Sequence, residues 1–210
     1  MHASGGRGDR SRFRGPSAAT FLVLGLILGV IIGAAGAFIA LRVVAPLPAP
    51  GQAQFTVELL PNMAYFERVS ELIKRAEKSV YVVMFVMRYD PKETPERDPA
   101  NALIELLVDA RNRGLDVRVV VDDTTRQSYP ETIEYLKSKG VPVRLDPKAG
   151  VTTHAKIVVV DGRCSVIGSH NWTESALSSN NEFSLLLCSK DFAGEVEGYF
   201  MELWEQGRPA

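Results

Sequence analysis

The sequence has few of the residues from which metal sites and base-stacking surfaces are built. Its 210 residues include three histidines and two cysteines. His2 and His170 lack the spacing of a metal-ligand set, so we predict no metal and no cofactor. Aromatic residues make up only 8% of the chain, which argues weakly against an extended surface for stacking nucleic-acid bases.

The chain also lacks a large excess of either charge, with a formal net charge of −1. Residues 1–50 hold five arginines and one aspartate, which leaves 19 basic and 24 acidic residues in 51–210, a net of −5. A mildly acidic domain has no global field that attracts polyanions. Any phosphate that it binds must be held by local groups.

One segment, Ala18–Leu41, has no charged residue over 24 positions. A bilayer-spanning helix needs about 20 apolar residues, whereas the apolar core of a cleaved signal peptide has about 7–15. We therefore predict a transmembrane anchor over residues 18–43, with a cleaved signal peptide as the alternative.

The arginines around this segment predict its orientation. Four precede it and only Arg42 follows closely. The positive-inside rule then places a basic tail, residues 1–17, in the cytoplasm and the rest of the chain on the extracytoplasmic side. Residues 44–54, with three prolines, are expected to be a stiff tether.

From residue 55 to 206 apolar strands alternate with amphipathic helices, without an internal repeat. Strands are expected at 55–60, 80–87, 117–121, 141–145, 156–160, 165–168 and 183–188, and helices at 64–78, 100–113, 130–139 and 191–205. This alternation predicts an α/β sandwich with a mixed sheet flanked by helices. We expect parallel strands early and hairpin pairing late.

The stretch from Val151 to Asn171 contains the most informative residues. In a strand, positions two apart face the same side, so His154 and Lys156 share a face. The turn at Asp161-Gly162 and the return strand can bring Ser169 and Asn171 beside them. An ammonium, a carboxamide and a hydroxyl around an imidazole can bind a phosphate, and the imidazole can attack its phosphorus.

The pattern His154-x-Lys156-x4-Asp161, followed by Gly168-Ser169-x-Asn171, resembles the HKD motif of the phospholipase D superfamily. The resemblance extends over residues 55–206 and predicts a phospholipase D-like catalytic domain. Only one copy of the motif is present, whereas larger members carry two. The chain is therefore most similar to the small single-motif members, bacterial periplasmic endonucleases and membrane-anchored Zucchini-type proteins.

The resemblance implies a role for each motif residue. His154 would be the nucleophile of a metal-independent phosphodiesterase and form a phosphohistidine, while Lys156 and Asn171 would hold the phosphate oxygens.

Glu182 would hydrogen-bond the histidine ring, Ser169 would support the pocket, and Asp161 would brace the turn. His170, at a variable position, would touch substrate or only fill space.

In-line displacement places the nucleophile and the acid on opposite sides of phosphorus. We therefore expect a homodimer with a shared site, in which the partner's histidine protonates the leaving alcohol. The substrate stays open between nucleic acid and phospholipid. The alternative function is an inactive module that binds anionic lipid or nucleic acid at the membrane.

Two further pairs of residues carry predictions. If Ser169 lies opposite Glu182, Cys164 faces Leu187, one position from Cys188, which is close enough for a disulfide after a small adjustment. The alternative is that both cysteines are small buried apolar residues. Asp122-Asp123 resembles a metal-binding pair, but helix capping is the simpler explanation.

Overall fold

The computed structural model describes residues 55–210. The predicted tail, transmembrane anchor and tether, residues 1–54, lie outside the described residues. Within residues 55–210, none of the helices combines the length and the apolar character that crossing a bilayer requires.

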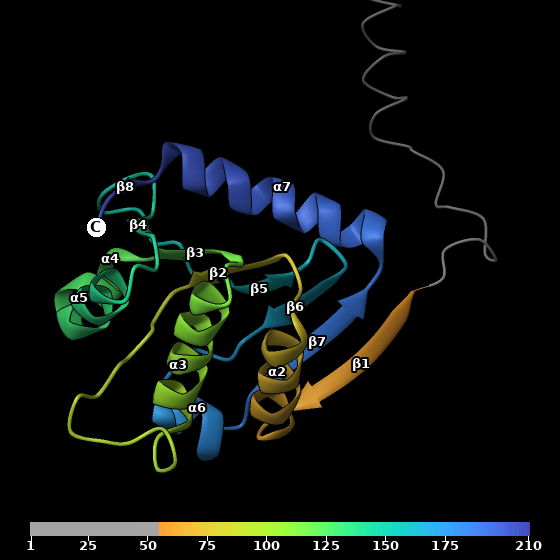
Figure 1. The fold of residues 1–210 in the computed structure, drawn as a ribbon, viewed down its shortest axis with the longest axis horizontal. Coiled ribbons are helices and arrows are strands. Elements are labelled where there is room, and N and C mark those ends of the chain that lie inside the picture. The colour runs from red at the N-terminus through yellow and green to blue at the C-terminus, as the bar shows by residue number, and fades with distance from the viewer. Residues whose placement is uncertain (1–54) are drawn as a thin grey trace, which may run out of the picture. The chain divides into compact units, whose positions relative to one another are not determined.

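The described chain forms one mixed sheet with helices on both faces (Figure 1). The strands are β1 (Thr56–Pro61), β2 (Ser79–Met84), β3 (Asp116–Val121), β4 (Val143–Leu145), β5 (Lys156–Val160), β6 (Cys164–Gly168), β7 (Phe183–Cys188) and β8 (Arg208–Pro209). The helices are α2 (Ala64–Arg75), α3 (Pro99–Asn112), α4 (Asp123–Ser128), α5 (Pro130–Ser138), α6 (Glu174–Ser178) and α7 (Lys190–Gln206). The strand order across the sheet is β1-β7-β6-β5-β2-β3-β4-β8.

The predicted α/β fold with a mixed sheet is confirmed, with one difference in the pairing. Strands β2, β3 and β4 pair in parallel, β5 and β6 form an antiparallel hairpin, and β7 pairs antiparallel with β6 after helix α6. Strand β1 is early in the sequence but pairs antiparallel with β7, because the chain enters the sheet at its far edge. Helices α4 and α6 and the two-residue β8 are additional to the predicted elements.

The central strands are buried on both sides because a layer of helix covers each face. Every residue of β2 from Val80 to Met84 is buried, as expected of a continuous apolar strand between two helical layers. Helix α7 packs on β2, β5, β6 and β7, and it crosses one face of the sheet in Figure 1. Helices α2 and α3 pack on each other and cover the other face.

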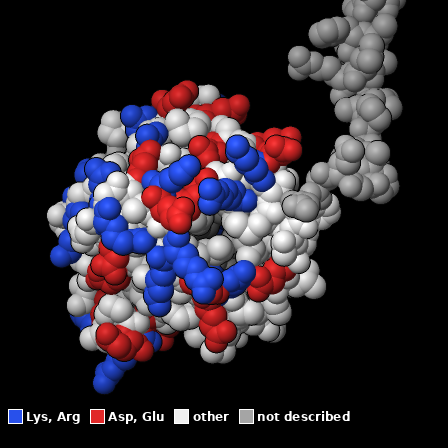
Figure 2. Space-filling model, turned by 45° about the vertical axis from the view of Figure 1, so that its right-hand side comes forward, with Lys and Arg blue, Asp and Glu red and all other residues white. Residues whose placement is uncertain are grey.

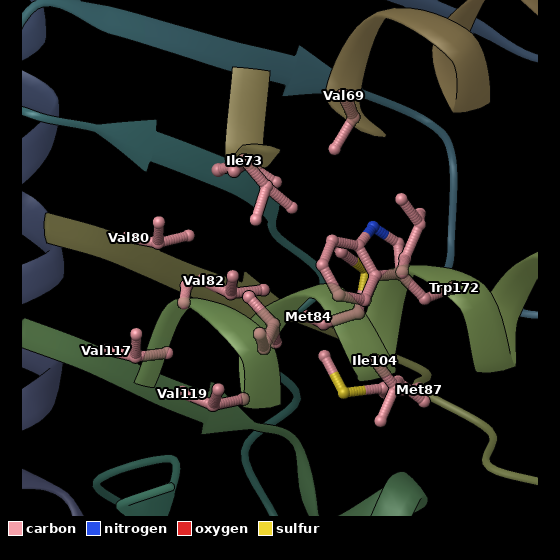
Figure 3. Packing of buried hydrophobic residues seen from close by; sticks show 14 of the residues in the cluster. Val69, Ile73, Val80, Val82, Met84, Met87, Ile104, Val117, Val119 and Trp172 are labelled. Carbon is pink, nitrogen blue, oxygen red and sulfur yellow. The ribbon is translucent and has the colours of Figure 1, made fainter. Parts of the chain in front are cut away.

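The larger core lies between the sheet and α2 and α3 (Figure 3). Val80, Val82, Val117 and Val119 point from the strands toward this layer. Trp172, the residue after Asn171, is fully buried in it. Burying so large a side chain stabilises the fold by a few kcal/mol, roughly 25 cal/mol per Å² of apolar surface, and it fixes the backbone of the motif beside it.

Cys164 and Cys188 form a disulfide, but the predicted register of β6 against β7 was wrong by one residue. Cys164 lies directly opposite Cys188, and Gly168 lies opposite Ser184. The prediction placed Ser169 opposite Glu182 because their side chains were expected to meet. In the structure the Ser169 hydroxyl reaches Glu182 diagonally, so the backbones need not face each other.

Candidate active site

The predicted site residues other than Asp161 and His170 lie at the end of the sheet where β2, β3 and β6 finish and β5 and β7 begin. Lys156 is the first residue of β5, Gly168 ends β6 and Phe183 starts β7. The turn between β5 and β6 returns the chain to this end, as the sequence predicted. The hairpin pairing is therefore what brings Ser169 and Asn171 toward His154 and Lys156.

His154 and Lys156 are in direct contact. The Lys156 Nζ lies 3.0 Å from Nδ1 and 3.1 Å from Nε2 of His154, and it donates to the His154 carbonyl oxygen at 2.8 Å. Lys156 is buried whereas His154 is exposed. The imidazole is therefore open to solvent, while the ammonium beside it is held inside the fold.

The Lys156 ammonium lies in a partly apolar environment. Burial lowers its pKa, while the nearby Glu182 carboxylate acts in the opposite direction. The Phe85 ring centroid is 4.9 Å from the Lys156 Nζ and 4.4 Å from the centroid of the His154 ring. Phe85 thus forms one wall of the site. Sequence reasoning missed it, although its place at the end of a buried strand next to β5 is a usable signal.

Asn171 is oriented by the backbone of the neighbouring segment. Its Oδ1 accepts the Val86 N–H at 3.2 Å. The backbone of the next residue, Trp172, makes two further bonds to this segment. Its N–H donates to the Val86 carbonyl at 3.0 Å, and its carbonyl oxygen accepts the Arg88 N–H at 2.8 Å. With the carbonyl oxygen of its side chain bound, the amide group of Asn171 presents its two N–H donors, the groups that a phosphate oxygen requires.

Glu182 bonds to Ser169 and not to the His154 ring. Its carboxylate accepts hydrogen bonds from the Ser169 hydroxyl and from the Asn180 amide, the latter at 3.1 Å. In the structure the expected bond from Glu182 to the imidazole is absent, and the Lys156 ammonium lies beside the ring. Ser169 also accepts the Phe183 N–H at 3.0 Å, so its pocket-supporting role agrees with the geometry.

Gly168 is required by the close approach of β6 and β7. A Cβ at this position would lie 2.1 Å from the Ser184 Oγ and 2.4 Å from the Ser184 Cα. The absence of a side chain therefore lets the two strands meet where Ser169 and Glu182 bond to each other.

His170 is fully buried, so of the two roles left open for it the structure favours space filling over contact with substrate. Its Nδ1 lies 2.7 Å from the Ser184 Oγ, its Nε2 lies 3.0 Å from the Asn62 carbonyl oxygen, and its ring stacks on Tyr65 at 4.3 Å. Burial lowers the pKa of the imidazole. The alternation of the strand ending at Gly168 continues through Ser169, which sends the next side chain into the core.

Asp161 lies at the opposite end of β5 from His154. Its carboxylate accepts the backbone N–H groups of Glu77, Lys78 and Ser79 at distances from 2.7 to 3.2 Å. Burial raises its pKa, but these three bonds outweigh that effect and the net pKa is lowered. This position fits the expectation that Asp161 braces the turn, and it is too far along β5 from His154 for Asp161 to act as a catalytic residue.

Asp122 caps α4, as the simpler interpretation of the acidic pair predicted. Its Oδ1 accepts the Thr124 N–H at 2.8 Å. Within residues 55–210 there is no group of three or more histidine, cysteine or acidic side chains placed to hold a metal ion.

Comparison with known proteins points to one family. The domain family described as "Cardiolipin synthase, PLD-like domain" matches residues 69–204. A mitochondrial cardiolipin hydrolase from Xenopus tropicalis is 32% identical over 145 residues, which cover 69% of this chain and 63% of that protein. One from Chlamydomonas reinhardtii is 29% identical over 101 residues, which cover 48% of this chain and 45% of that protein. The chain thus spans less than two thirds of the length of these relatives.

Solved structures show the same fold. The phospholipase D family member Nuc from Salmonella typhimurium has a TM-score of 0.63 at 23% identity, and the match covers 74% of this chain and 97% of Nuc. NucT from Helicobacter pylori has a TM-score of 0.62 at 16% identity, with coverage of 75% and 100%. Both chains are covered almost completely by the part of this protein that the structure describes.

Proposed function

Because the chain belongs to the phospholipase D superfamily, we propose that residues 55–206 hydrolyse a phosphodiester through a phosphohistidine intermediate. One observation supports this most directly: an exposed imidazole in contact with a buried ammonium. A module that only bound anions would need the cation but not an imidazole placed at 3 Å from it.

In the proposed reaction a ring nitrogen of His154 attacks phosphorus, and the bond from phosphorus to one ester oxygen breaks. The leaving alcohol takes a proton from the second histidine. Water then attacks the phosphorus of the phosphohistidine, the bond from phosphorus to the His154 nitrogen breaks, and the second histidine takes a proton from the water. Lys156 and the Asn171 amide bind the phosphate oxygens as charge develops on them.

We place the second histidine in another copy of this chain. In-line displacement needs groups on both sides of phosphorus, and His170 cannot serve because it is buried and bonded on both nitrogens. Among the described residues this leaves His154 as the one histidine exposed at the site. A two-fold axis beside His154 would supply the same residue from the partner.

An apolar part of the sheet supports this dimer. Val57, Leu59 and Phe183 are 44%, 61% and 51% exposed. They lie on the face opposite the one where Leu60 is buried and Glu58 pairs with Arg68. Figure 2 shows uncharged surface around the start of the described chain. We propose that this face binds a second copy.

Glutamate at Leu59 tests the interface. Leu59→Glu should be monomeric by analytical ultracentrifugation and should lose turnover, because a charge is costly to bury. Ser138→Glu adds the same charge at an exposed position on α5 and should stay dimeric and active. A fully active monomer would refute the shared site.

We propose a phospholipid diester of the cardiolipin type as the substrate. The support is the name of the matching domain family and of the hydrolases to which the chain is similar. A predicted anchor and a disulfide agree with an enzyme at the extracytoplasmic face of a membrane, since disulfides persist outside the cytoplasm. The alternative substrate is nucleic acid, and a comparison of substrates distinguishes the two.

The test compares wild type with His154→Ala on bis(p-nitrophenyl) phosphate, cardiolipin, phosphatidylcholine, single-stranded DNA and RNA. Wild type should turn over the simple diester and cardiolipin, and the variant should lose several orders of magnitude in rate. Acid-labile phosphate on the trapped protein would identify the phosphohistidine. Equal rates for the two proteins would refute the proposed function. Cleavage of nucleic acid alone would identify nucleic acid, and not phospholipid, as the substrate.

A further inference from the structure

His154 lies in a segment without secondary structure, between Asp146 and the start of β5 at Lys156. Because no helix or strand holds this backbone, its position depends on individual hydrogen bonds. The Thr153 N–H, one residue before His154, donates to the Asp122 Oδ2 at 2.7 Å. This bond joins the segment to the end of β3, which is 31 positions away in the sequence.

The two oxygens of Asp122 have different partners. Oδ1 accepts the N–H and the hydroxyl of Thr124, at 2.8 and 2.6 Å, and so caps α4. Oδ2 is directed instead at Thr153. Helix capping therefore accounts for only one of the two oxygens.

Asp122 is 3% exposed, and both of its carboxylate oxygens accept hydrogen bonds from within the chain. Its own N–H donates to the Met84 carbonyl at 3.2 Å, which fixes it at the end of β2 as well as β3. The bond to Thr153 thus ties the segment that carries His154 to two buried strands. A rigid attachment of this kind is what precise placement of a reacting group requires.

We propose that Asp122 is a positioning residue: through the Thr153 amide it holds His154 at the geometry needed for attack on phosphorus. This inference rests on the proposed role of His154 as nucleophile. A displacement of about 1 Å at a reacting group can cost on the order of a hundredfold in rate.

Asp122→Asn separates positioning from capping. Asparagine caps a helix about as well as aspartate, so a residue that only capped α4 would tolerate the change. Thr124 presents two donors and Thr153 one, so the amide oxygen stays on Thr124 and the amide N–H group faces the Thr153 N–H. The two donors repel each other, and the segment before His154 loses its bond to β3, whereas the bond from the Phe85 N–H to the Ala155 carbonyl remains.

The control is Asp123→Asn, the same isosteric change on the next residue. Asp123 pairs with Arg126 and Arg208 and makes no bond to the segment that carries His154. Asp123→Asn removes one negative charge from the same end of the sheet as Asp122→Asn does, so general electrostatic effects are matched between the two variants.

The experiment measures kcat and KM of the full chain on bis(p-nitrophenyl) phosphate for wild type, His154→Ala, Asp122→Asn and Asp123→Asn. Asp122→Asn should lower kcat by about ten- to a hundredfold. Its KM should match that of Asp123→Asn, because both variants remove one negative charge from the same end of the sheet. Asp123→Asn should keep the wild-type kcat. Hydrogen exchange at residues 151–155 should become faster in Asp122→Asn alone.

Two results distinguish failure of this inference from failure of the proposed function. If His154→Ala is as active as wild type, the proposed function fails and the Asp122 inference falls with it. If His154→Ala is inactive but Asp122→Asn matches Asp123→Asn in kcat and in hydrogen exchange, only the positioning role is refuted. If Asp122→Asn fails to fold, Thr153→Pro decides, since proline has no N–H to donate to the Asp122 Oδ2 and leaves the cap of α4 in place. That variant should lower kcat by about ten- to a hundredfold, and an unchanged kcat overturns the proposal.

Discussion

Cys164 on β6 lies directly opposite Cys188 on β7, and the disulfide between them joins the two strands that present Ser169 and Glu182 at their other ends. The crosslink closes a loop with a sequence separation of 24 residues. For a loop of this length the chain-entropy model assigns a stabilisation of about 3 kcal/mol.

Replacing both cysteines by serine should therefore lower the free energy of unfolding by about 2–4 kcal/mol. Turnover per folded molecule should be retained, because the disulfide lies at the end of the strands away from His154. Urea unfolding monitored by tryptophan fluorescence measures the first effect. Equal urea midpoints for the wild-type and double-serine proteins would contradict the prediction.

Asp161→Asn should lower stability without lowering kcat. Asparagine tolerates the positive φ of 56° at this position, but it loses the charge-assisted bonds to Glu77, Lys78 and Ser79. The expected cost is about 1–3 kcal/mol. A large loss of kcat in fully folded Asp161→Asn would instead indicate that Asp161 takes part in catalysis.

His170 should make stability depend on pH. Its folded pKa is lowered by burial, so the unfolded chain binds more protons in the window below its ordinary pKa of about 6.5. The contribution of neutral His170 is complete above that value and is lost as the pH falls toward the folded pKa.

The measurement compares wild type with His170→Gln between pH 7.5 and 5. Wild type should be the more stable protein at pH 7.5, because its imidazole bonds to Ser184 and Asn62. The difference between the two should shrink as the pH falls, since only wild type carries the buried imidazole. A constant difference across the range would show that the pKa of His170 is the same in the folded and unfolded chains.

Sequence reasoning identified the elements and the motif because both depend on local patterns. The buried strands have apolar runs, and the spacing of His154 and Lys156 places them on one face by strand geometry alone. The partners of these side chains depend on tertiary geometry. Lys156 contacts the His154 ring, and Glu182 bonds to Ser169; no local pattern predicts which neighbour each of these side chains takes.

The one-residue error in the register between β6 and β7 has the same origin. Two side chains can meet diagonally across a pair of strands, so a predicted contact between Ser169 and Glu182 does not determine which backbone residues face each other. Asp122 was likewise recognised as a cap from its sequence position. Its second bond, to Thr153, joins residues 31 positions apart and becomes visible only in the fold.

Gly168→Ala should damage both the fold and the site. The new Cβ would overlap the Ser184 backbone as well as its hydroxyl, so side-chain rotation cannot relieve the clash and β6 must move from β7. The hydrogen bond between His170 and Ser184 would be strained, and Ser169 would shift from Glu182. We expect a loss of about 3 kcal/mol or more, with a lower kcat in the molecules that remain folded.

Gly194→Ala, in helix α7, is the matched control for that change. A Cβ there meets nothing within 4 Å, and alanine is favoured over glycine in a helix interior by about 0.5–1 kcal/mol. Gly194→Ala should therefore be slightly more stable than wild type and equally active. Thermal unfolding and turnover of the two variants, measured side by side, test whether the close approach of β6 and β7 is what requires glycine. Comparable stability of Gly168→Ala and Gly194→Ala would mean that the strands can separate at little cost, and that the bond from Ser169 to Glu182 does not depend on their contact.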